Sequence, residues 1–162
     1  MANEPEALVL DSSPLITLGR AGALEIIQSL PFRFLVPSAV AHEITAGSLQ
    51  GWPVSVPSWI EVQQLKTPVS QLAVRSLDRG EAEVISLALE LQLPRVCIDE
   101  WRGRRMASAL GLEVTGSLGL LGLAKTSGII GEIRPWAAKV VSTGGRFDFR
   151  LIQQFLAAFG EE

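Results

Sequence analysis

The sequence predicts an α/β protein, a three-layer α/β/α sandwich in which helices cover both faces of a mainly parallel central sheet. Two observations predict this fold class. Short apolar runs that contain Val and Ile alternate with longer segments of helical spacing. Each apolar run is also followed by polar residues or by Pro, Ser or Thr, where a strand would end. An alternation of this kind favours βα units and a parallel sheet.

The expected elements follow one another in strand–helix order. We expect strands over residues 7–10, 32–36, 59–65, 95–98 and 112–115. Helices are expected over residues 23–30, 37–47, 80–92 and 102–111. Gly47 and Gly111 stand where a helix would stop. The segment 47–58 is predicted to be an exposed loop, and residues 147–159 a closing amphipathic helix.

The composition is that of a globular protein without a broad basic surface. The 162 residues suit one domain, and 48% hydrophobic with 19% charged residues excludes a disordered chain. The net charge of −3 argues against a binder that neutralises a long stretch of DNA backbone. It leaves room for an RNA enzyme with a local basic patch.

Two other features bear on compartment and chemistry. The single cysteine, Cys97, cannot form an internal disulfide, and its apolar run RVCI predicts a buried core thiol. The N-terminus lacks the pattern of a signal peptide, and Lys125 interrupts the apolar stretch 116–130, so no membrane span is expected. A cytoplasmic protein is therefore expected.

Acidic residues follow two of the predicted strands. Asp11 comes directly after the first strand, and Asp99 and Glu100 come directly after the fourth. In open parallel sheets, ligands bind outside the carboxyl ends of the strands. If the two strands are neighbours, these carboxylates converge at one edge of the sheet.

Two further acids lie on predicted helices. Glu43 falls at the border between the apolar and polar faces of the helix 37–47. Glu81 shares a face with residues that should pack inward, so we expect it to point toward a site. Glu83 instead shares a face with Ser86 and Glu90, which predicts a solvated side chain.

Each acid also has a purely structural interpretation. Asp11 and Asp99 could cap the helices that follow them, and Glu43 could be an ordinary exposed glutamate. Asp78 and Glu81 have the spacing of a capping box. Several carboxylates within a few ångströms, however, cannot all stay ionised without a cation or protonation. The four acids together therefore favour an oxygen-ligated Mg²⁺ or Mn²⁺ site.

The remaining motifs exclude several enzyme classes. His42 is the only histidine and is predicted to lie on the surface; there is no Cys/His cluster for zinc and no phosphate-binding glycine motif. Ser117 can cap the helix that follows the last strand. Three arginines that follow the acidic pair could form a solvated face with local ion pairs, or a rim that contacts phosphates: Arg102, Arg104 and Arg105.

The sequence resembles the PIN-domain nucleases, in particular a prokaryotic branch related to the toxins of type II toxin–antitoxin pairs. The likeness is carried by LVLDSSPLITLGRAG, VPSAVAHEI, LDRGEAEVISLALEL and VCIDEWRGRRMASALGLEVTGSLGLLGLAKTSG. It covers roughly residues 7–130. The resemblance implies a single PIN-like domain over residues 1–162, with a C-terminal helical extension over about 133–160.

The resemblance also implies an activity and a set of site residues. The implied protein is a Mg²⁺- or Mn²⁺-dependent endoribonuclease, with an RNA substrate, a protein antitoxin whose basic side chain plugs the acidic pocket, and a homodimeric assembly. Glu81 departs from the aspartate that is common at the third acidic position. The implied catalytic and metal-binding acids are Asp11, Glu43, Glu81 and Asp99, with Glu100 as the alternative to Asp99. The implied supports of a metal-bound water are Ser12 and Ser13, and the implied phosphate contacts are Arg102, Arg104 and Arg105.

Two other classes compete with the nuclease. An aspartyl-phosphate enzyme is disfavoured because Ser13 stands where a phosphatase of that kind has its second aspartate. A catalytically decayed PIN-like interaction module, which acts through a dimer or a partner, is the stronger alternative. Trp52, Trp101 and Trp136 are compatible with such interfaces, whereas Trp59 is expected in the core.

Overall fold

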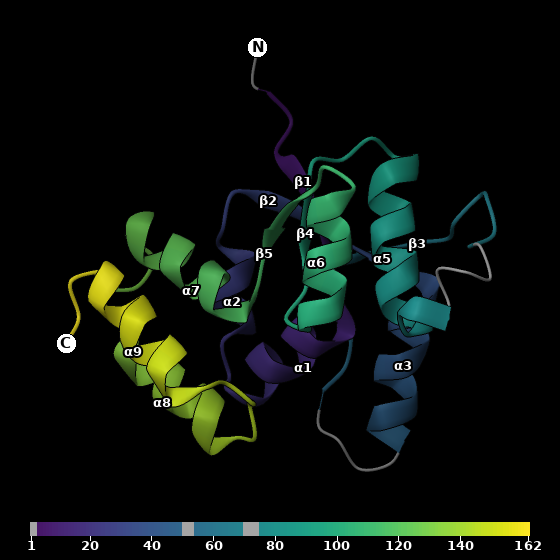
Figure 1. Ribbon diagram of the computed structural model, residues 1–162. Helices are drawn as coiled ribbons and strands as arrows, with labels where there is room; N and C mark the ends of the chain where they lie inside the picture. Colours follow the sequence, from purple (N-terminus) through teal and green to yellow (C-terminus); the bar gives the residue numbers. More distant parts are fainter. Residues whose placement is uncertain (1–2, 50–53, 70–74) are drawn as a thin grey trace.

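A five-stranded parallel sheet forms the centre of the computed structural model, which describes residues 3–49, 54–69 and 75–162 (Figure 1). The strands lie in the order β3-β2-β1-β4-β5, and every neighbouring pair is parallel. This confirms the predicted fold class. The strands are β1 (Glu6–Leu10), β2 (Phe32–Pro37), β3 (Glu61–Gln63), β4 (Arg95–Cys97) and β5 (Glu113–Thr115).

The strands form because short apolar runs are buried from both sides. Leu8, Val9 and Leu10 of β1 are fully or almost fully buried, as are Val96 and Cys97 of β4. Strands covered on both faces read as continuous apolar runs, and these runs made them visible in the sequence. The expected strand 59–65 is reduced to three residues, and Cys97 is the buried thiol that its apolar run predicted.

The helices form two groups, one on each face of the sheet (Figure 1). In one group α5 packs against α3 and α6, and in the other α1, α2 and α7 pack together. Among the described residues, the helices that precede β4 are α1 (Ser12–Arg20), α2 (Leu24–Gln28), α3 (Ser38–Leu49) and α5 (Arg79–Glu90). Those that follow it are α6 (Trp101–Ala109), α7 (Ser117–Thr126), α8 (Arg134–Ser142) and α9 (Phe149–Ala158).

Helix α7 is the helix expected after the last strand, although no helical spacing marked it; its N-cap residue is Gly116 and not Ser117, which is the first residue of the helix. Its sequence SLGLLGLAKT contains two glycines, which weaken helix propensity. A Cβ on Gly122 would lie 2.6 Å from Cζ of Phe159 and 2.9 Å from Cζ of Phe155. The glycine therefore lets the C-terminal aromatic rings pack directly on α7, and this tertiary contact outweighs the propensity.

The predicted start of the loop 47–58 was also incorrect. Helix α3 continues to Leu49, beyond the glycine at which it was expected to stop. Residues 50–53, including Trp52, lie outside the described residues. Trp59 is partly buried, and its ring stacks edge-on against Phe34 with 5.6 Å between centroids, so its packing against the core is confirmed.

The order of the strands reverses at β1, and this brings the ends of β1 and β4 together. Leu10 pairs with Cys97, and the Asp11 N–H donates to the Cys97 carbonyl at 3.0 Å. Ile98 in turn donates its N–H to the Thr115 carbonyl at 2.9 Å. The residues that follow β1, β4 and β5 therefore lie along one edge of the sheet, at its topological switch point.

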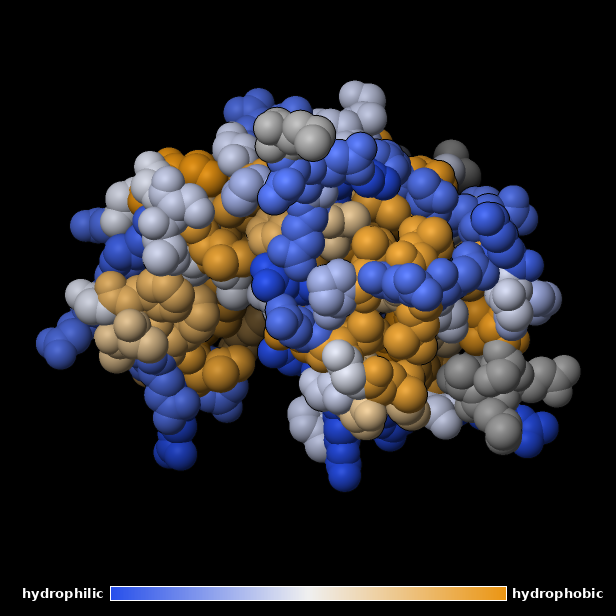
Figure 2. Space-filling model, turned by 90° about the horizontal axis from the view of Figure 1, so that it is seen from above, coloured by the Kyte–Doolittle hydropathy of each residue, from blue (hydrophilic) through white to orange (hydrophobic). Residues whose placement is uncertain are grey.

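The opposite end of the molecule carries exposed apolar side chains. Figure 2, which looks down on the ends of the helices that are uppermost in Figure 1, shows apolar surface over α5 and α6. Leu89, Leu91 and Leu110, at or just beyond the C-terminal ends of these helices, are all exposed. No helix among the described residues is long and apolar enough to cross a membrane.

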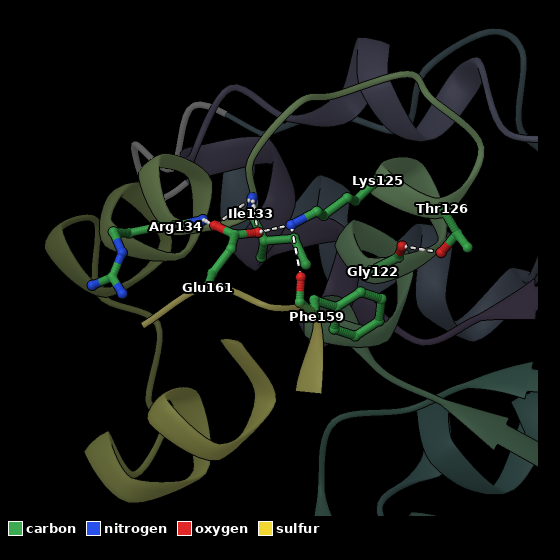
Figure 3. Close-up of polar contacts among 7 residues, drawn as sticks. All are labelled: Gly122, Lys125, Thr126, Ile133, Arg134, Phe159 and Glu161. Atoms are coloured by element: carbon green, nitrogen blue, oxygen red, sulfur yellow. Dashed lines mark hydrogen bonds and ion pairs between the residues drawn. The ribbon is translucent and has the colours of Figure 1, made fainter. Parts of the chain in front are cut away.

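A carboxylate near the end of the chain joins the C-terminal helices to α7 (Figure 3). Glu161 accepts hydrogen bonds from the Ile133 and Arg134 N–H groups at 2.8 and 2.9 Å and pairs with Lys125 Nζ at 2.8 Å. Burial alone would raise the pKa of Glu161, but the Lys125 ammonium and these N–H groups lower it to about 2. The carboxylate thus caps α8 and holds it beside α7.

Replacement of Glu161 by alanine should destabilise the protein by about 2 kcal/mol, because charged hydrogen bonds are lost and Lys125 is left without this partner. The melting temperature at pH 7 should fall by roughly 4–8 °C, measured by circular dichroism. Glu162→Ala, next in the chain and exposed, is the matched control and should melt like the wild type. Equal melting temperatures for the two variants would contradict the assigned role of Glu161.

Candidate active site

Asp11 occupies the junction between the central strand and the first helix. It is 2% exposed and is the N-cap residue of α1, where its carboxylate accepts the Ser12 N–H at 2.8 Å. The helix begins directly after β1, so the aspartate cannot move out into solvent. Asp11 therefore caps α1, as its structural interpretation suggested. It also lies at the carboxyl edge of the sheet, directly after β1.

Glu43 reaches the same place from α3. The Ser12 hydroxyl donates to Glu43 Oε2 at 2.8 Å, although the two residues are 31 positions apart. A Cβ on Gly80 would collide with Glu43 Oε1, so the absence of a side chain at Gly80 allows the start of α5 to lie against this carboxylate. The arrangement places Glu43 beside Asp11 and the N-terminal turn of α5.

Glu81 comes from the first turn of α5 and is 5% exposed. The Asp78 carboxylate caps this helix by accepting the Glu81 N–H at 2.8 Å, as the capping-box spacing predicted. The Glu81 side chain lies over α6, where a Cβ on Gly103 would come within 3.3 Å of its carboxyl carbon. Two glycines, Gly80 and Gly103, thus leave room for two of the acids.

Burial and nearby negative charges raise the pKa values of Asp11, Glu43 and Glu81. Burial raises the pKa of Asp11 well above its ordinary value, and the negative charges of Asp78, Glu81 and Glu43 raise it further. The hydrogen bond from the Ser12 N–H opposes this rise. Burial likewise raises the pKa of Glu43. The pKa of Glu81 reaches about 7, from burial first and then from the charges of Asp78 and Glu100. The ionised forms of all three carboxylates are therefore disfavoured in this environment.

Asp99 lies at the same sheet edge but faces a different group. Its two carboxylate oxygens accept the Ser117 N–H at 2.7 Å and the Ser117 hydroxyl at 2.6 Å. Burial raises the pKa of Asp99, and the bonds from Ser117 oppose that rise. Asp99 therefore caps α7, a helix farther along the chain than the one expected, and Ser117 is its donor.

The prediction that Glu83 is solvated was wrong. The residue is 7% exposed, and its carboxylate accepts from Arg79 Nε at 3.1 Å. Its negative charge also raises the pKa of Glu43. Helical spacing compared Glu83 only with other residues of α5, whereas α3 packs against α5 and covers part of that face. His42, by contrast, is exposed as predicted.

The three arginines of α6 do not form one rim. Arg102 lines a cleft of about 320 Å³ with Ser13, Asp78, Glu81 and Glu100. Arg104 Nη1 instead donates to the Ile98 carbonyl at 2.9 Å, and the Arg105 guanidinium lies 5.2 Å from the centre of the Trp101 ring.

Sequence reasoning missed two residues of this cleft. Arg75, which precedes α5 in the chain, lines the cleft together with Arg102. Asp78 was noted only for its spacing from Glu81, although it also contributes negative charge to Asp11 and Glu43. That spacing was the available signal for Asp78; Arg75 had none.

The donor chemistry fits a hard divalent cation, since every candidate ligand is a carboxylate or hydroxyl oxygen. Burial and the negative charges of neighbouring carboxylates raise the pKa values of these acids, and a bound cation would oppose that rise. Within the described ranges, however, no three His, Cys, Asp or Glu side chains are grouped closely enough to hold one ion as they stand. Cation binding would thus require the side chains of Glu43 or Glu81 to rotate, while Asp11 is fixed by its cap.

A parallel five-stranded sheet with carboxylates at its switch point defines an α/β domain with a candidate ligand site at that edge, and comparison with known proteins specifies the family. A family model described as "DUF3368: PIN domain" matches residues 7–161, and the chain therefore belongs to the PIN-domain family. PIN domains are generally nucleases and typically use divalent metal ions.

A solved structure supports the fold. A PilT N-terminus domain protein from the hyperthermophilic archaeon Sulfolobus solfataricus P2 is similar, with a TM-score of 0.57 and 18% sequence identity. The alignment covers 73% of this chain and 92% of that one. No curated protein sequence matches the chain.

Proposed function

We propose that this protein is a metal-dependent endoribonuclease that hydrolyses RNA phosphodiester bonds at the cleft beside Asp11. One observation carries the proposal: the carboxylates of Asp11, Glu43 and Glu81, from β1–α1, α3 and α5, lie at the switch point of a PIN fold, where burial and neighbouring negative charges raise the pKa of each. Placing several carboxylates together and away from water costs stability. A cation-binding function explains why the protein has them there.

The proposed ligands of Mg²⁺ or Mn²⁺ are Asp11, Glu43 and Glu81, with Asp99 or Glu100 as the fourth acid. Held by these acids, such an ion would supply an activated water and charge stabilisation at the leaving oxygen, so no histidine base would be required. Ser12 holds Glu43 in place through its hydroxyl, and Ser13 lines the cleft where a water would sit. Glu100 lines the cleft directly, which supports it as a contributor alongside Asp99.

The arginines of α6 are proposed to contact the RNA backbone, each at a different place. Arg102 stands at the acid cleft, and we add Arg75 to the set because it lines the same cleft. Arg104 lines a neighbouring pocket together with Trp101, and the Arg105 guanidinium lies over the Trp101 ring. Guanidinium groups next to an anionic site offset the repulsion between the acids and the phosphates.

The biological setting is proposed to be that of a toxin in a toxin–antitoxin pair: one PIN-like domain in the cytoplasm, a homodimer, inhibited by a protein antitoxin. A basic antitoxin side chain would fit the uncompensated acids of the cleft.

The test of this function is Mn²⁺ binding to the metal-free protein, measured by calorimetry. We expect the wild type to bind and Asp11→Asn to lose binding, because Asp11 is the acid held rigidly at the sheet edge. Glu25→Gln, which removes an exposed acid on α2, is the charge control and should bind like the wild type. Cleavage of RNA by the wild type should require the metal and stop in Asp11→Asn. Equal affinity of wild type and Asp11→Asn for Mn²⁺ would contradict the proposal.

The interaction module is the second candidate, and two observations favour it. Both oxygens of Asp99 are already engaged by Ser117, which leaves the expected four-acid set incomplete. Exposed Leu89, Leu91 and Leu110 lie at the end of the molecule opposite the cleft, where a second copy could bury them. Absence of Mn²⁺ binding in the wild type, together with a dimer in sedimentation equilibrium, would favour this candidate.

A further inference from the structure

A second pocket adjoins the acid cleft and is lined partly by the C-terminal helices. It has a volume of about 590 Å³, within the range of about 300–1,000 Å³ that is typical of small-ligand sites. Glu100 lines both this pocket and the acid cleft, so the two hollows share a wall. An RNA strand bound across the cleft would therefore pass directly into the pocket.

Part of the pocket lining is aromatic and apolar. Trp101 stands at its edge and is 66% exposed, with the Arg105 guanidinium near its ring. Phe147, Leu151 and Phe155, from α9 and the segment before it, form the opposite wall. An exposed tryptophan beside a half-apolar hollow offers a stacking surface for a planar ring.

The charged residues of the pocket are arranged unequally. Arg104 and Arg146 bring two guanidinium groups to its lining. Two of the three acids there are engaged by helix N-termini: Asp99 accepts from Ser117, and Asp148 accepts the Arg150 N–H at 2.7 Å. The third is Glu100, on the wall shared with the acid cleft. The two arginines come from different parts of the chain: Arg104, on α6, lies beside Asp99, and Arg146 belongs to the segment before α9.

We propose that this pocket binds one nucleotide of the RNA strand next to the nucleotide that is cleaved. The base stacks on Trp101, and Arg146 contacts the adjoining phosphate. The chemistry of the pocket, a planar aromatic surface with guanidinium groups beside it, matches the two parts of a nucleotide. This inference rests on the proposed ribonuclease function, and it makes the C-terminal helices part of the substrate-binding surface.

The experiment separates the base from the backbone. Two labelled ten-residue oligomers are compared: oligouridylate, whose bases stack little on one another, and an abasic sugar-phosphate chain of the same length. Dissociation constants are measured by fluorescence anisotropy with Ca²⁺ in place of Mn²⁺, so that cleavage does not interfere. We expect the wild type to bind oligouridylate more tightly, and Trp101→Ala to reduce this preference about tenfold. Trp101→Phe, which keeps a stacking ring, should restore most of it.

The phosphate contact has a matched pair of variants. Arg146→Ala should weaken both oligomers and lower the slope of log affinity against log salt by about 0.7, the value for one contact to a single strand. Arg150→Ala removes an equal charge four residues away, from a side chain that does not line the pocket, and should leave the slope unchanged.

The outcomes distinguish this inference from the proposed function. The nucleotide pocket would be overturned, even if the wild type cleaves RNA, by either of two results. One is an equal preference of Trp101→Ala and wild type for oligouridylate over the abasic chain. The other is an equal salt slope for Arg146→Ala and Arg150→Ala. Conversely, base-dependent binding that disappears in Trp101→Ala, in a protein that cleaves no RNA with Mn²⁺, would support the pocket and overturn the ribonuclease. Equal affinity of the wild type for the two oligomers would exclude a bound base and turn attention to a peptide side chain as the occupant.

Discussion

In metal-free buffer the protein should become less stable as the pH rises from 5 to 8. The pKa of Glu81 is about 7 in the folded protein and 4.5 in an ordinary environment, and burial raises the pKa values of Asp11, Glu43 and Asp99 in the same direction. A folded state with raised carboxyl pKa values binds more protons than the unfolded chain. The stabilisation is thus present below about pH 4.5 and is lost as the pH rises through 7.

The expected loss is on the order of 2 kcal/mol between pH 5 and 8, after allowance for solvent screening of the partly accessible acids. It should be measured by urea unfolding, followed by tryptophan fluorescence in the presence of EDTA. Glu161, whose pKa is lowered to about 2, is ionised throughout this range and does not contribute to the slope. Glu81→Gln should flatten the profile, whereas the exposed Glu25→Gln should keep it. Stability that rises over this pH range would contradict the electrostatic description of the cleft.

Saturating Mn²⁺ should reverse the effect under the proposed metal-binding function. A cation binds the ionised carboxylates, so protons compete with it below pH 7. The increase in stability caused by Mn²⁺ should therefore be larger at pH 8 than at pH 5. An increase of the same size at both pH values would place the metal away from Glu81.

Gly116→Ala should be strongly destabilising, although it adds only one methyl group at the sheet edge. The backbone at Gly116 is extended, with φ −137° and ψ −173°, so alanine can adopt it without strain. A Cβ there would, however, lie 2.7 Å from Asp99 Oδ1 and 2.8 Å from Arg104 Nη1. The Asp99 carboxylate would have to leave Ser117, with loss of its two hydrogen bonds.

The expected cost is about 2–4 kcal/mol, from two hydrogen bonds to a charged acceptor, with a fall in melting temperature of roughly 8 °C. Gly131→Ala is the control, because a Cβ there would meet no heavy atom within 4 Å. Equal stability of the two variants would show that the contact between Asp99 and Ser117 contributes little. Mn²⁺ binding to Gly116→Ala adds a second result: weakened binding supports Asp99 as a metal ligand, and unchanged binding assigns it to capping alone.

The position of Asp11 was predictable because it depends on local sequence. The residue follows a run of four apolar residues, and a polar residue at that point ends a buried strand whatever lies around it. The same holds for Asp99 after β4 and for the Asp78 cap of α5, which is set by a spacing of three residues. The parallel direction of the strands followed from the alternation of strands and helices, whereas the sequence left open whether β1 and β4 are neighbours.

The pairing of side chains from different elements was not predictable in this way. Glu83 looked solvated because its helical neighbours Ser86 and Glu90 are polar, but α3 covers it. Arg104 looked like a phosphate contact because it follows two acids, but its guanidinium also binds the Ile98 carbonyl.

The sequence by itself determined the parallel sheet, its buried strands and the acids at their carboxyl ends, because hydrophobic periodicity and strand termination are properties of contiguous residues. Only the tertiary structure decided which groups those acids face: Glu43 meets the Ser12 hydroxyl, Asp99 meets Ser117, and Trp101 meets the C-terminal helices across a pocket. The physical reason is that hydrogen bonds and burial between elements depend on the angles and distances at which helices cross the sheet. Glycines such as Gly80 and Gly103 set how closely the elements approach there, and the cost of a Cβ at those positions exists only once the neighbouring element is in place.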